Sequence, residues 1–249
     1  MDDTEKKKML FLVEGAKRDI RVITKLFESY SELDMKYKIV PYCTNIHVLY
    51  QEFFEKEGAS DELDLLQVLK SKEKSFEAKK IFDERYTDIL LVFDLDPQDD
   101  KFDDDKIRKM ETYFCESSDM GKLYLNYPMI EAFYHMPVIP DPDYQSRTVS
   151  LDELITGKYK ERVQKETRGN DYNKYIKDRS DVNYVILENI RKAFKLLGED
   201  PEITDKWREI NLSAVLNRQL EFLKLEYLHV LCTCVMFIYD YNWELLFRD

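Results

Sequence analysis

Two aspartates separated by a single residue follow an unbroken apolar run near the middle of the chain. Residues 89–93 have the composition of a strand buried on both faces, and the run ends at Asp94 and Asp96. Ligands of open α/β sheets bind outside the carboxyl ends of the strands, which places both carboxylates at such an edge. Because hard divalent cations prefer oxygen ligands, the pair is a candidate metal site. An isolated Asp-x-Asp pair is more often a solvated turn. The metal-site interpretation therefore depends on whether other strand ends supply further carboxylates.

A second apolar run also ends in a carboxylate. Residues 9–13 predict another buried strand, which is followed directly by Glu14 and Gly15. Residues 16–30 then repeat apolar side chains at helical spacing, which predicts a helix. This segment is therefore expected to form a strand, a glycine turn and a helix.

A third predicted strand covers residues 122–126 and ends at Asn126. Pro128 suits the first turn of a following helix, which would carry Glu131. Alternating strands and helices favour right-handed crossovers and a parallel sheet, whose strand ends meet at one edge. The carboxylates expected to converge there are those of Glu14, Asp94, Asp96 and Glu131.

Clustered carboxylates without an evident histidine or cysteine nucleophile are typical of metal-assisted phosphodiester cleavage. In that chemistry Mg²⁺, or Mn²⁺ in its place, activates water and stabilises charge on the phosphate. We expect Asp94, Asp96 and Glu131 to be metal ligands, and Glu14 to be a ligand or a general base. Asn126 is expected to orient a ligand or the loop.

Two basic residues and one histidine lie close to these carboxylates in the chain. Lys17 and Arg18 lie just inside the helix after Glu14, and helix amino termini favour anions. Both are therefore candidate phosphate contacts, although ordinary surface charges are as common there. His135 lies four residues after Glu131 and either shares the site or fills a core position, of which we favour the core.

The chain of 249 residues is acidic overall, with a formal net charge of −12, which argues against a generic nucleic-acid coat. Residues 158–179 reverse this balance with eight basic and four acidic residues, and tyrosines are interleaved. Such a segment is typical of phosphate contacts with base stacking, or of a solvated helix face. Its candidate nucleic-acid contacts are Lys174, Lys177 and Arg179.

In order and position, the carboxylate motifs resemble the Toprim domain of topoisomerases, primases and small nucleases. The resemblance rests on Val13-Glu14-Gly15, on Asp94-Leu95-Asp96 and on the segment from Asn126 to Glu131. These motifs are most similar to those of the OLD-like and RloB-like Toprim nucleases of bacterial defence systems, over residues 8–136. The resemblance implies a nuclease that holds Mg²⁺ with these carboxylates and acts in anti-phage defence on DNA or RNA.

The same resemblance bears on partners. The chain has no Gly-x-x-x-x-Gly-Lys-[Ser/Thr] loop, so an OLD-like activity needs a separately encoded ATPase, or the chain acts alone. A homodimer is expected at the level of the family. The alternative function is a catalytically silent Toprim-fold module that binds a partner protein through its carboxyl-terminal half. A primase-like nucleotidyl transferase is a third possibility, without a nucleotide-binding signature to support it.

The predicted fold class is α/β: a Toprim-like, Rossmannoid parallel sheet flanked by helices, followed by an all-helical carboxyl-terminal part. Beyond about residue 150 the apolar spacing is helical, including residues 212–231. Three prolines between residues 136 and 150 mark a boundary or an active-site loop. We therefore expect a catalytic domain over residues 1–148 and a helical domain over residues 149–249.

The cysteines and the short apolar segments indicate a cytoplasmic protein. Cys232 and Cys234 lie in an apolar run without a second pair at zinc-finger spacing, and we interpret them as buried thiols in a reducing compartment. The apolar run at residues 9–13 is too short for a signal peptide. The run at residues 230–239 falls short of the ~20 residues that span a bilayer, so no membrane association is expected.

Overall fold

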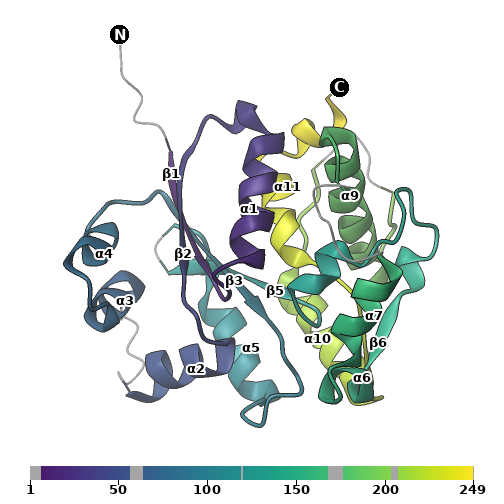
Figure 1. The fold of residues 1–249 in the computed structure, drawn as a ribbon, viewed down its shortest axis with the longest axis horizontal. Helices are drawn as coiled ribbons and strands as arrows, with labels where there is room; N and C mark the ends of the chain where they lie inside the picture. The colour runs from purple at the N-terminus through teal and green to yellow at the C-terminus, as the bar shows by residue number, and fades with distance from the viewer. Residues whose placement is uncertain (1–6, 57–63, 119, 168–175, 203–206, 249) are drawn as a thin grey trace.

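The computed structural model describes residues 7–56, 64–118, 120–167, 176–202 and 207–248. Its main sheet has five strands in the order β2-β1-β3-β5-β4 (Figure 1). The strands are β1 (Lys8–Val13), β2 (Lys36–Pro41), β3 (Asp88–Asp94), β4 (Cys115–Glu116) and β5 (Gly121–Asn126). The first, second, third and fifth are parallel to one another, and β4 is an antiparallel edge strand. The predicted α/β class with a largely parallel sheet is therefore confirmed.

The apolar runs form the central strands because they are buried on both faces. Met9 to Val13 of β1 and Leu90 to Phe93 of β3 have almost no exposed surface. Both runs were predicted as buried strands, and both are flanked by parallel neighbours. Their carboxyl ends consequently lie at the same edge of the sheet.

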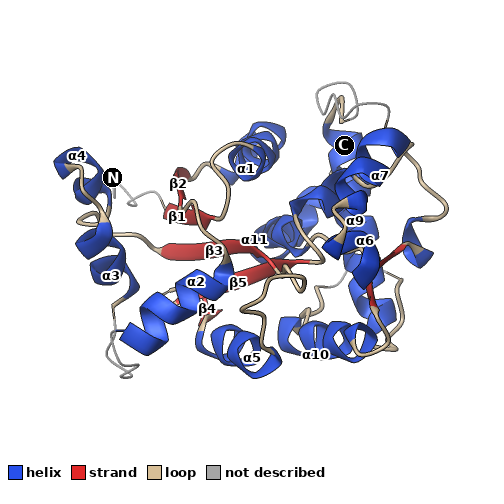
Figure 2. Cartoon of the chain, turned by 60° about the horizontal axis from the view of Figure 1, so that its bottom comes forward, coloured by secondary structure: helices blue, strands red, loops and turns tan. Residues whose placement is uncertain are grey.

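Helices cover both faces of this sheet. The α-helices of the described residues are α1 (Arg18–Ser29), α2 (Ile46–Tyr50), α3 (Leu65–Lys72), α4 (Phe76–Ile81), α5 (Asp104–Tyr113), α6 (Leu151–Ile155), α7 (Lys158–Glu166), α9 (Arg179–Leu196), α10 (Leu212–Leu223) and α11 (Phe237–Asn242). Figure 2 shows α1 and α11 on one side of the sheet and α5 and α10 on the other. Phe11 of β1 packs edge-on against Phe27 of α1 and Phe237 of α11, with ring centroids 5.5 and 5.1 Å away. Among the described residues, the last α-helix, α11, therefore lies in the same layer as α1.

Short turns of other helix types complete the chain. They are the 3-10 helices η1 (Ser31–Leu33), η3 (Ile130–Tyr134), η4 (Tyr144–Ser146), η5 (Thr233–Met236) and η6 (Trp243–Phe247), and the π-helix η2 (Gln51–Lys56). Two of the α-helices begin with a side-chain cap. The Val48 N–H donates to Asn45 Oδ1 at 3.1 Å before α2, and the Lys106 N–H donates to Asp103 Oδ1 at 2.9 Å before α5.

The expectation of an all-helical carboxyl-terminal part is wrong in one respect. The helix predicted over residues 212–231 ends at Leu223, and the chain turns through Glu226, whose φ is +65°. Strand β7 (Tyr227–His229) follows and pairs antiparallel with β6 (Thr148–Ser150). These residues form a strand because their backbone pairs with β6, which is distant in the sequence. Local apolar spacing does not reveal such a partner.

The carboxyl-terminal half adds directly to the end of the main sheet. Tyr127 and Leu231 exchange two backbone hydrogen bonds of 2.8 Å, which extends β5 past Asn126. Figure 1 shows α6, α7, α9 and α10 gathered beside this side of the sheet. One hydrophobic core cluster contains residues of β1, β5, α9 and α11 alike.

Cys232 and Cys234 are buried free thiols, as predicted, whereas Cys43 and Cys115 are exposed. No helix within the described part of the chain is long and apolar enough to cross a membrane.

Candidate functional site

Glu14 and Asp94 meet where β1 and β3 end. The backbone N–H of Glu14 continues the ladder by donating to the carbonyl of Val92 at 3.0 Å. The Glu14 side chain turns across this edge, and its Oε2 accepts from the backbone N–H of Asp94 at 3.1 Å. The parallel pairing of the two strands thus brings together two of the predicted site residues.

Asn126 lies beside Asp94 because the two residues are register partners in β3 and β5. The Asn126 Nδ2 group donates to Asp94 Oδ1 at 3.3 Å, and Asn126 has no exposed surface. Its Oδ1 accepts from the thiol of Cys232 and the backbone N–H of Cys234, both at 3.4 Å. Asn126 thus fixes the Asp94 carboxyl from the side of β5, and its expected role of orienting a ligand or the loop stays a prediction.

Asp96 is held differently from its neighbour Asp94. Its φ is +44°, in the left-handed region, so the chain turns sharply after the strand. Gln98 Nε2 donates to Asp96 Oδ1 at 3.0 Å. Burial is the main cause that raises the pKa of Asp96. The carboxylate is near the edge of the sheet but is directed to the loop that follows it.

Glu131 is buried in the 3-10 helix η3 and forms an ion pair with Arg18 at the start of α1. The helix begins at Ile130 with Met129 as its N-cap, so the prediction that Pro128 forms its first turn is wrong. The Tyr127-Leu231 bridge holds the chain extended at this point. Glu131 is nevertheless brought to the same pocket as Glu14 and Asp94.

His135 is a core residue, as favoured from the sequence. Its ring has no exposed surface, with Nδ1 3.3 Å from the Tyr159 hydroxyl and Nε2 2.8 Å from Glu166 Oε2. Burial, and then the charge of Arg147, lowers the pKa of His135 to about 2. A neutral ring that donates to Glu166 and accepts from Tyr159 satisfies both nitrogens. His135 therefore joins η3 to α7.

A pocket of about 420 Å³ opens at this edge of the sheet. Its lining residues come from the turn after β1, the start of α1, the end of β3, η3 and α7. They are Glu14, Gly15, Ala16, Lys17, Arg18, Asp19, Asp94, Ile130, Glu131 and Lys160. Several of the predicted residues therefore line one cavity at the carboxyl ends of the strands, where open α/β sheets bind their ligands.

Asp19 is a pocket residue that sequence reasoning missed. It is 4% exposed, and its Oδ1 is buried without a hydrogen-bond partner among the described residues. Gly15 makes room for it, since a Cβ at that position would lie 2.5 Å from Asp19 Oδ2. A signal was present in the sequence, because Asp19 shares the buried face of α1 with Val22, Ile23 and Leu26.

Burial and mutual repulsion disfavour ionisation of these carboxyl groups. Burial, and then the charge of Asp96, raises the pKa of Glu14 to about 8. Burial raises the pKa of Asp19 to about 6. Burial, and then the charge of Glu14, raises the pKa of Asp94 well above its ordinary range. A bound cation would therefore stabilise the ionised form of these buried carboxyl groups.

Lys160 is a second missed residue. It projects from α7, lines the pocket, and its charge lowers the pKa values of Glu14 and Asp96 against the effect of burial. The sequence showed only a basic segment over residues 158–179. His135 helps to pack α7 against η3. This packing places Lys160, rather than another lysine of the segment, at the pocket.

The other predicted nucleic-acid contacts lie in different surroundings. Lys17 is exposed at the rim of the pocket, and Lys177 is exposed away from it. Arg179 pairs with Glu32, donates to the Leu245 carbonyl at 2.8 Å and lies 5.0 Å from the Tyr30 ring centroid. Lys174 lies outside the described residues.

The carboxylates do not form a closed ligand cluster as they stand. Among the described residues, no group of three or more His, Cys, Asp or Glu side chains is arranged to hold a metal ion. Contacts within the protein account for this arrangement. Glu131 faces Arg18, Asp96 faces Gln98, and Glu14 accepts from the Asp94 backbone.

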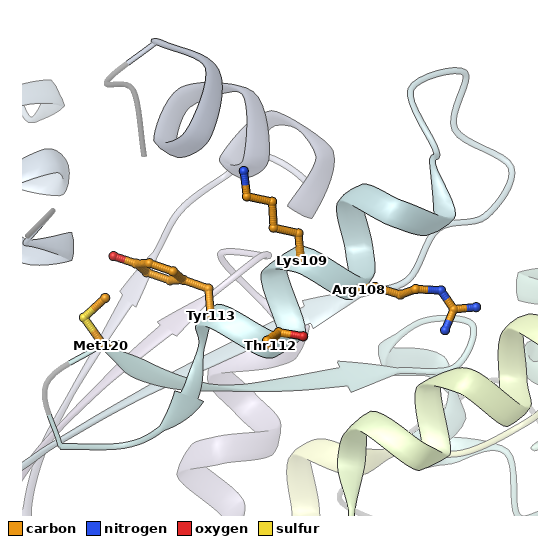
Figure 3. A pocket seen from close by; sticks show the side chains of 5 residues that line it. All are labelled: Arg108, Lys109, Thr112, Tyr113 and Met120. Carbon is orange, nitrogen blue, oxygen red and sulfur yellow. The ribbon is translucent and has the colours of Figure 1, made fainter. Parts of the chain in front are cut away.

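Another pocket, of about 590 Å³, lies on the second half of α5 and the start of β5. Figure 3 shows its lining side chains, which are Arg108, Lys109, Thr112, Tyr113 and Met120. Met120 directly precedes β5, so this pocket is at the opposite end of the strand from Asn126. It contains none of the predicted site residues.

Compared with known proteins, the chain matches no family model, no curated protein and no solved structure. The class of protein is therefore defined by its fold and its site. It is an α/β protein with a largely parallel sheet of five strands and an acidic pocket at the carboxyl ends of the parallel strands.

Proposed function

We propose that this protein is a divalent-metal-dependent phosphodiesterase of the Toprim type that cleaves nucleic acid. The observation that carries the proposal is the acidic pocket, in which Glu14, Asp19, Asp94 and Glu131 meet beside Lys160. Buried Asp19 contributes an oxygen without a partner. The order of the motifs along the chain and the parallel sheet support the Toprim type, and the role in anti-phage defence rests on the resemblance of those motifs.

The donor set fits a hard cation such as Mg²⁺ or Mn²⁺. All four pocket carboxylates offer oxygen, and the orphaned Oδ1 of Asp19 needs a positive partner. These four residues would hold the cation, with Asp96 adjacent. A bound cation supplies positive charge that activates water and stabilises the charge developing on a phosphate.

The protein's own residues provide the remaining chemistry. Glu14 lies against Asp94 at the strand ends, where its carboxylate would bind the cation or accept a proton from water. Asn126 holds Asp94 in place, and Asp94 in turn holds Glu14 through its backbone N–H. Lys160 and Lys17 are exposed residues that line the pocket, so both are placed to meet a phosphodiester.

The substrate is a phosphodiester backbone contacted locally. A net charge of −12 opposes binding over a wide surface, so affinity must come from the few cations at the pocket. Lys17 is the N-cap residue of α1 and Lys160 lies on α7, so the two cations come from separate elements that line the pocket. A DNA or RNA strand crossing the pocket meets both.

The test is cleavage of plasmid, single-stranded DNA and tRNA in the presence of Mg²⁺, Mn²⁺ or EDTA. We expect metal-dependent cleavage that is lost in Asp94→Asn and Glu14→Gln. Asp105→Asn is the matched control, because Asp105 is an exposed acid on α5 outside the pocket. Absence of cleavage with every metal, or full activity of Asp94→Asn, would contradict the proposal and favour a catalytically silent interaction module.

A further inference from the structure

One ion pair joins two elements that line the pocket. Arg18 Nη1, at the start of α1, contacts Glu131 Oε1 of η3, and the two residues are 113 positions apart in the chain. The Glu131 side chain is 3% exposed, whereas that of Arg18 is 47% exposed. The half-exposed guanidinium of Arg18 therefore neutralises the buried carboxylate of Glu131.

Arg18 is placed to act on more than Glu131. Its charge also lowers the pKa of the neighbouring Asp19 against the effect of burial. The charge of Glu131 acts in the opposite sense on both Asp19 and Asp94. Arg18 consequently offsets part of the repulsion among the pocket carboxylates.

A divalent cation and Arg18 compete for the same carboxylate. A cation bound at the Glu131 carboxylate repels the guanidinium of Arg18, so cation binding weakens this ion pair. The half-exposed Arg18 has room to leave, and it stands at the first position of a 12-residue helix, where the dipole favours anions. A guanidinium at this position matches the two oxygens of a phosphate group.

We propose that Arg18 is an exchangeable internal counter-ion of the cation site. A divalent cation displaces it from Glu131, and the released guanidinium then binds the substrate phosphate. Cation binding and phosphate binding are thereby coupled, and by linkage each strengthens the other. This inference rests on the proposed function, because it requires that the carboxylates bind a cation.

The first test measures Mn²⁺ binding to the purified full chain by calorimetry. Arg18→Met is compared with Lys17→Met, which removes an equal charge from the adjacent exposed position of the same pocket. We expect Arg18→Met to bind Mn²⁺ about tenfold more tightly than wild type, a change of ~1.4 kcal/mol. Lys17→Met reports the general effect of one charge, which is expected to be about twofold.

The second test measures the coupling. A short phosphorothioate oligonucleotide serves as the phosphate probe, with and without Mn²⁺. Wild type is expected to bind it more tightly when Mn²⁺ is present, and Arg18→Met is expected to lose most of this gain. Arg18→Lys, which keeps the charge without the planar fork, is expected to be intermediate.

A third readout needs no ligand other than the metal. In EDTA, Arg18→Met is expected to unfold at a lower temperature than Lys17→Met, since Glu131 is left buried and unpaired. Added Mn²⁺ should then raise the unfolding temperature of Arg18→Met by more than that of wild type.

The outcomes separate the two proposals. If wild type and all variants fail to bind Mn²⁺, the cation site itself is refuted and the counter-ion role with it. If wild type binds Mn²⁺ but Arg18→Met behaves like Lys17→Met, the cation site stands and the exchange is refuted. Tighter Mn²⁺ binding without a change in the oligonucleotide coupling also refutes the exchange.

Discussion

The side-chain amide of Asn126 donates to Asp94 Oδ1 over 3.3 Å, and it does so from a position without exposed surface. Its oxygen is turned to the opposite side, toward Cys232 and Cys234 of the carboxyl-terminal half. The amide orientation is thereby set from two sides. A turn more than a hundred residues away thus helps to position a carboxylate of the pocket.

Replacing Asn126 with Ala should destabilise the protein and weaken the cation site together. The buried Asp94 carboxyl and the Cys234 N–H each lose a partner, which costs ~1–3 kcal/mol in the free energy of unfolding. Urea unfolding and Mn²⁺ binding measure the two effects. Asn211→Ala, which removes the N-cap of α10, is the control for a stability loss of ~1 kcal/mol away from the pocket. Equal cation affinity in both variants would contradict this role of Asn126.

Glu14 predicts a pH dependence of stability in the absence of metal. Its pKa rises from an ordinary value of 4.5 to about 8 on folding, mainly because of burial. The folded protein therefore binds this proton more tightly, and the associated stability is present below pH 4.5 and is lost as the pH rises through about 8. Glu14→Gln should make the fall in unfolding free energy across this range shallower, by on the order of 2 kcal/mol.

The measurement is urea unfolding in EDTA at several pH values. Glu28→Gln is the matched control, because Glu28 is an exposed residue of α1. We expect it to retain the wild-type pH profile. A Glu14→Gln profile parallel to that of wild type would show that Glu14 is not the group responsible.

Lys160 should contribute to phosphate binding, and its neighbour Lys158 should contribute less. Both are exposed lysines of α7, but among the described residues Lys160 lines the pocket and Lys158 does not. We expect Lys160→Met to weaken oligonucleotide binding and to reduce the salt slope by about 1. Lys158→Met serves as the charge-matched control. If the two variants have the same salt slope, α7 acts only through its overall charge.

Arg179 should behave as a structural residue although the sequence predicts a nucleic-acid contact. Its ties to Glu32, to the Leu245 carbonyl and to the Tyr30 ring hold α9 to the rest of the chain. We expect Arg179→Ala to lower the unfolding free energy by ~1–2 kcal/mol. Lys177→Ala, at an exposed position, should change it by less than about 0.5 kcal/mol.

Oligonucleotide binding then distinguishes the two basic residues. A loss of affinity in Lys177→Ala supports the predicted contact at that position. A loss of affinity in Arg179→Ala without any loss of stability would show that the ion pair with Glu32 is incidental.

The local pattern of the sequence determined the strands and the edge at which their carboxylates meet. An apolar run such as residues 89–93 has few alternatives to a buried strand, because its residues are β-prone and lack polar partners. Alternating strands and helices then imply a parallel order, which aligns the ends of β1, β3 and β5. Glu14, Asp94 and Asn126 followed from these two rules without knowledge of any contact.

Only the tertiary structure decided which further side chains reach that edge. Asp19 lies in the first turn of α1, and Lys160 is one of several lysines in a basic segment. Helical spacing puts Asp19 on the buried face of α1, but only the packing of α1 and α7 shows that Asp19 and Lys160 both reach the pocket. The same holds for β7, whose partner strand precedes it by about eighty residues. The ion pair of Arg18 with Glu131 likewise joins residues 113 positions apart, so local sequence patterns carry no information about it.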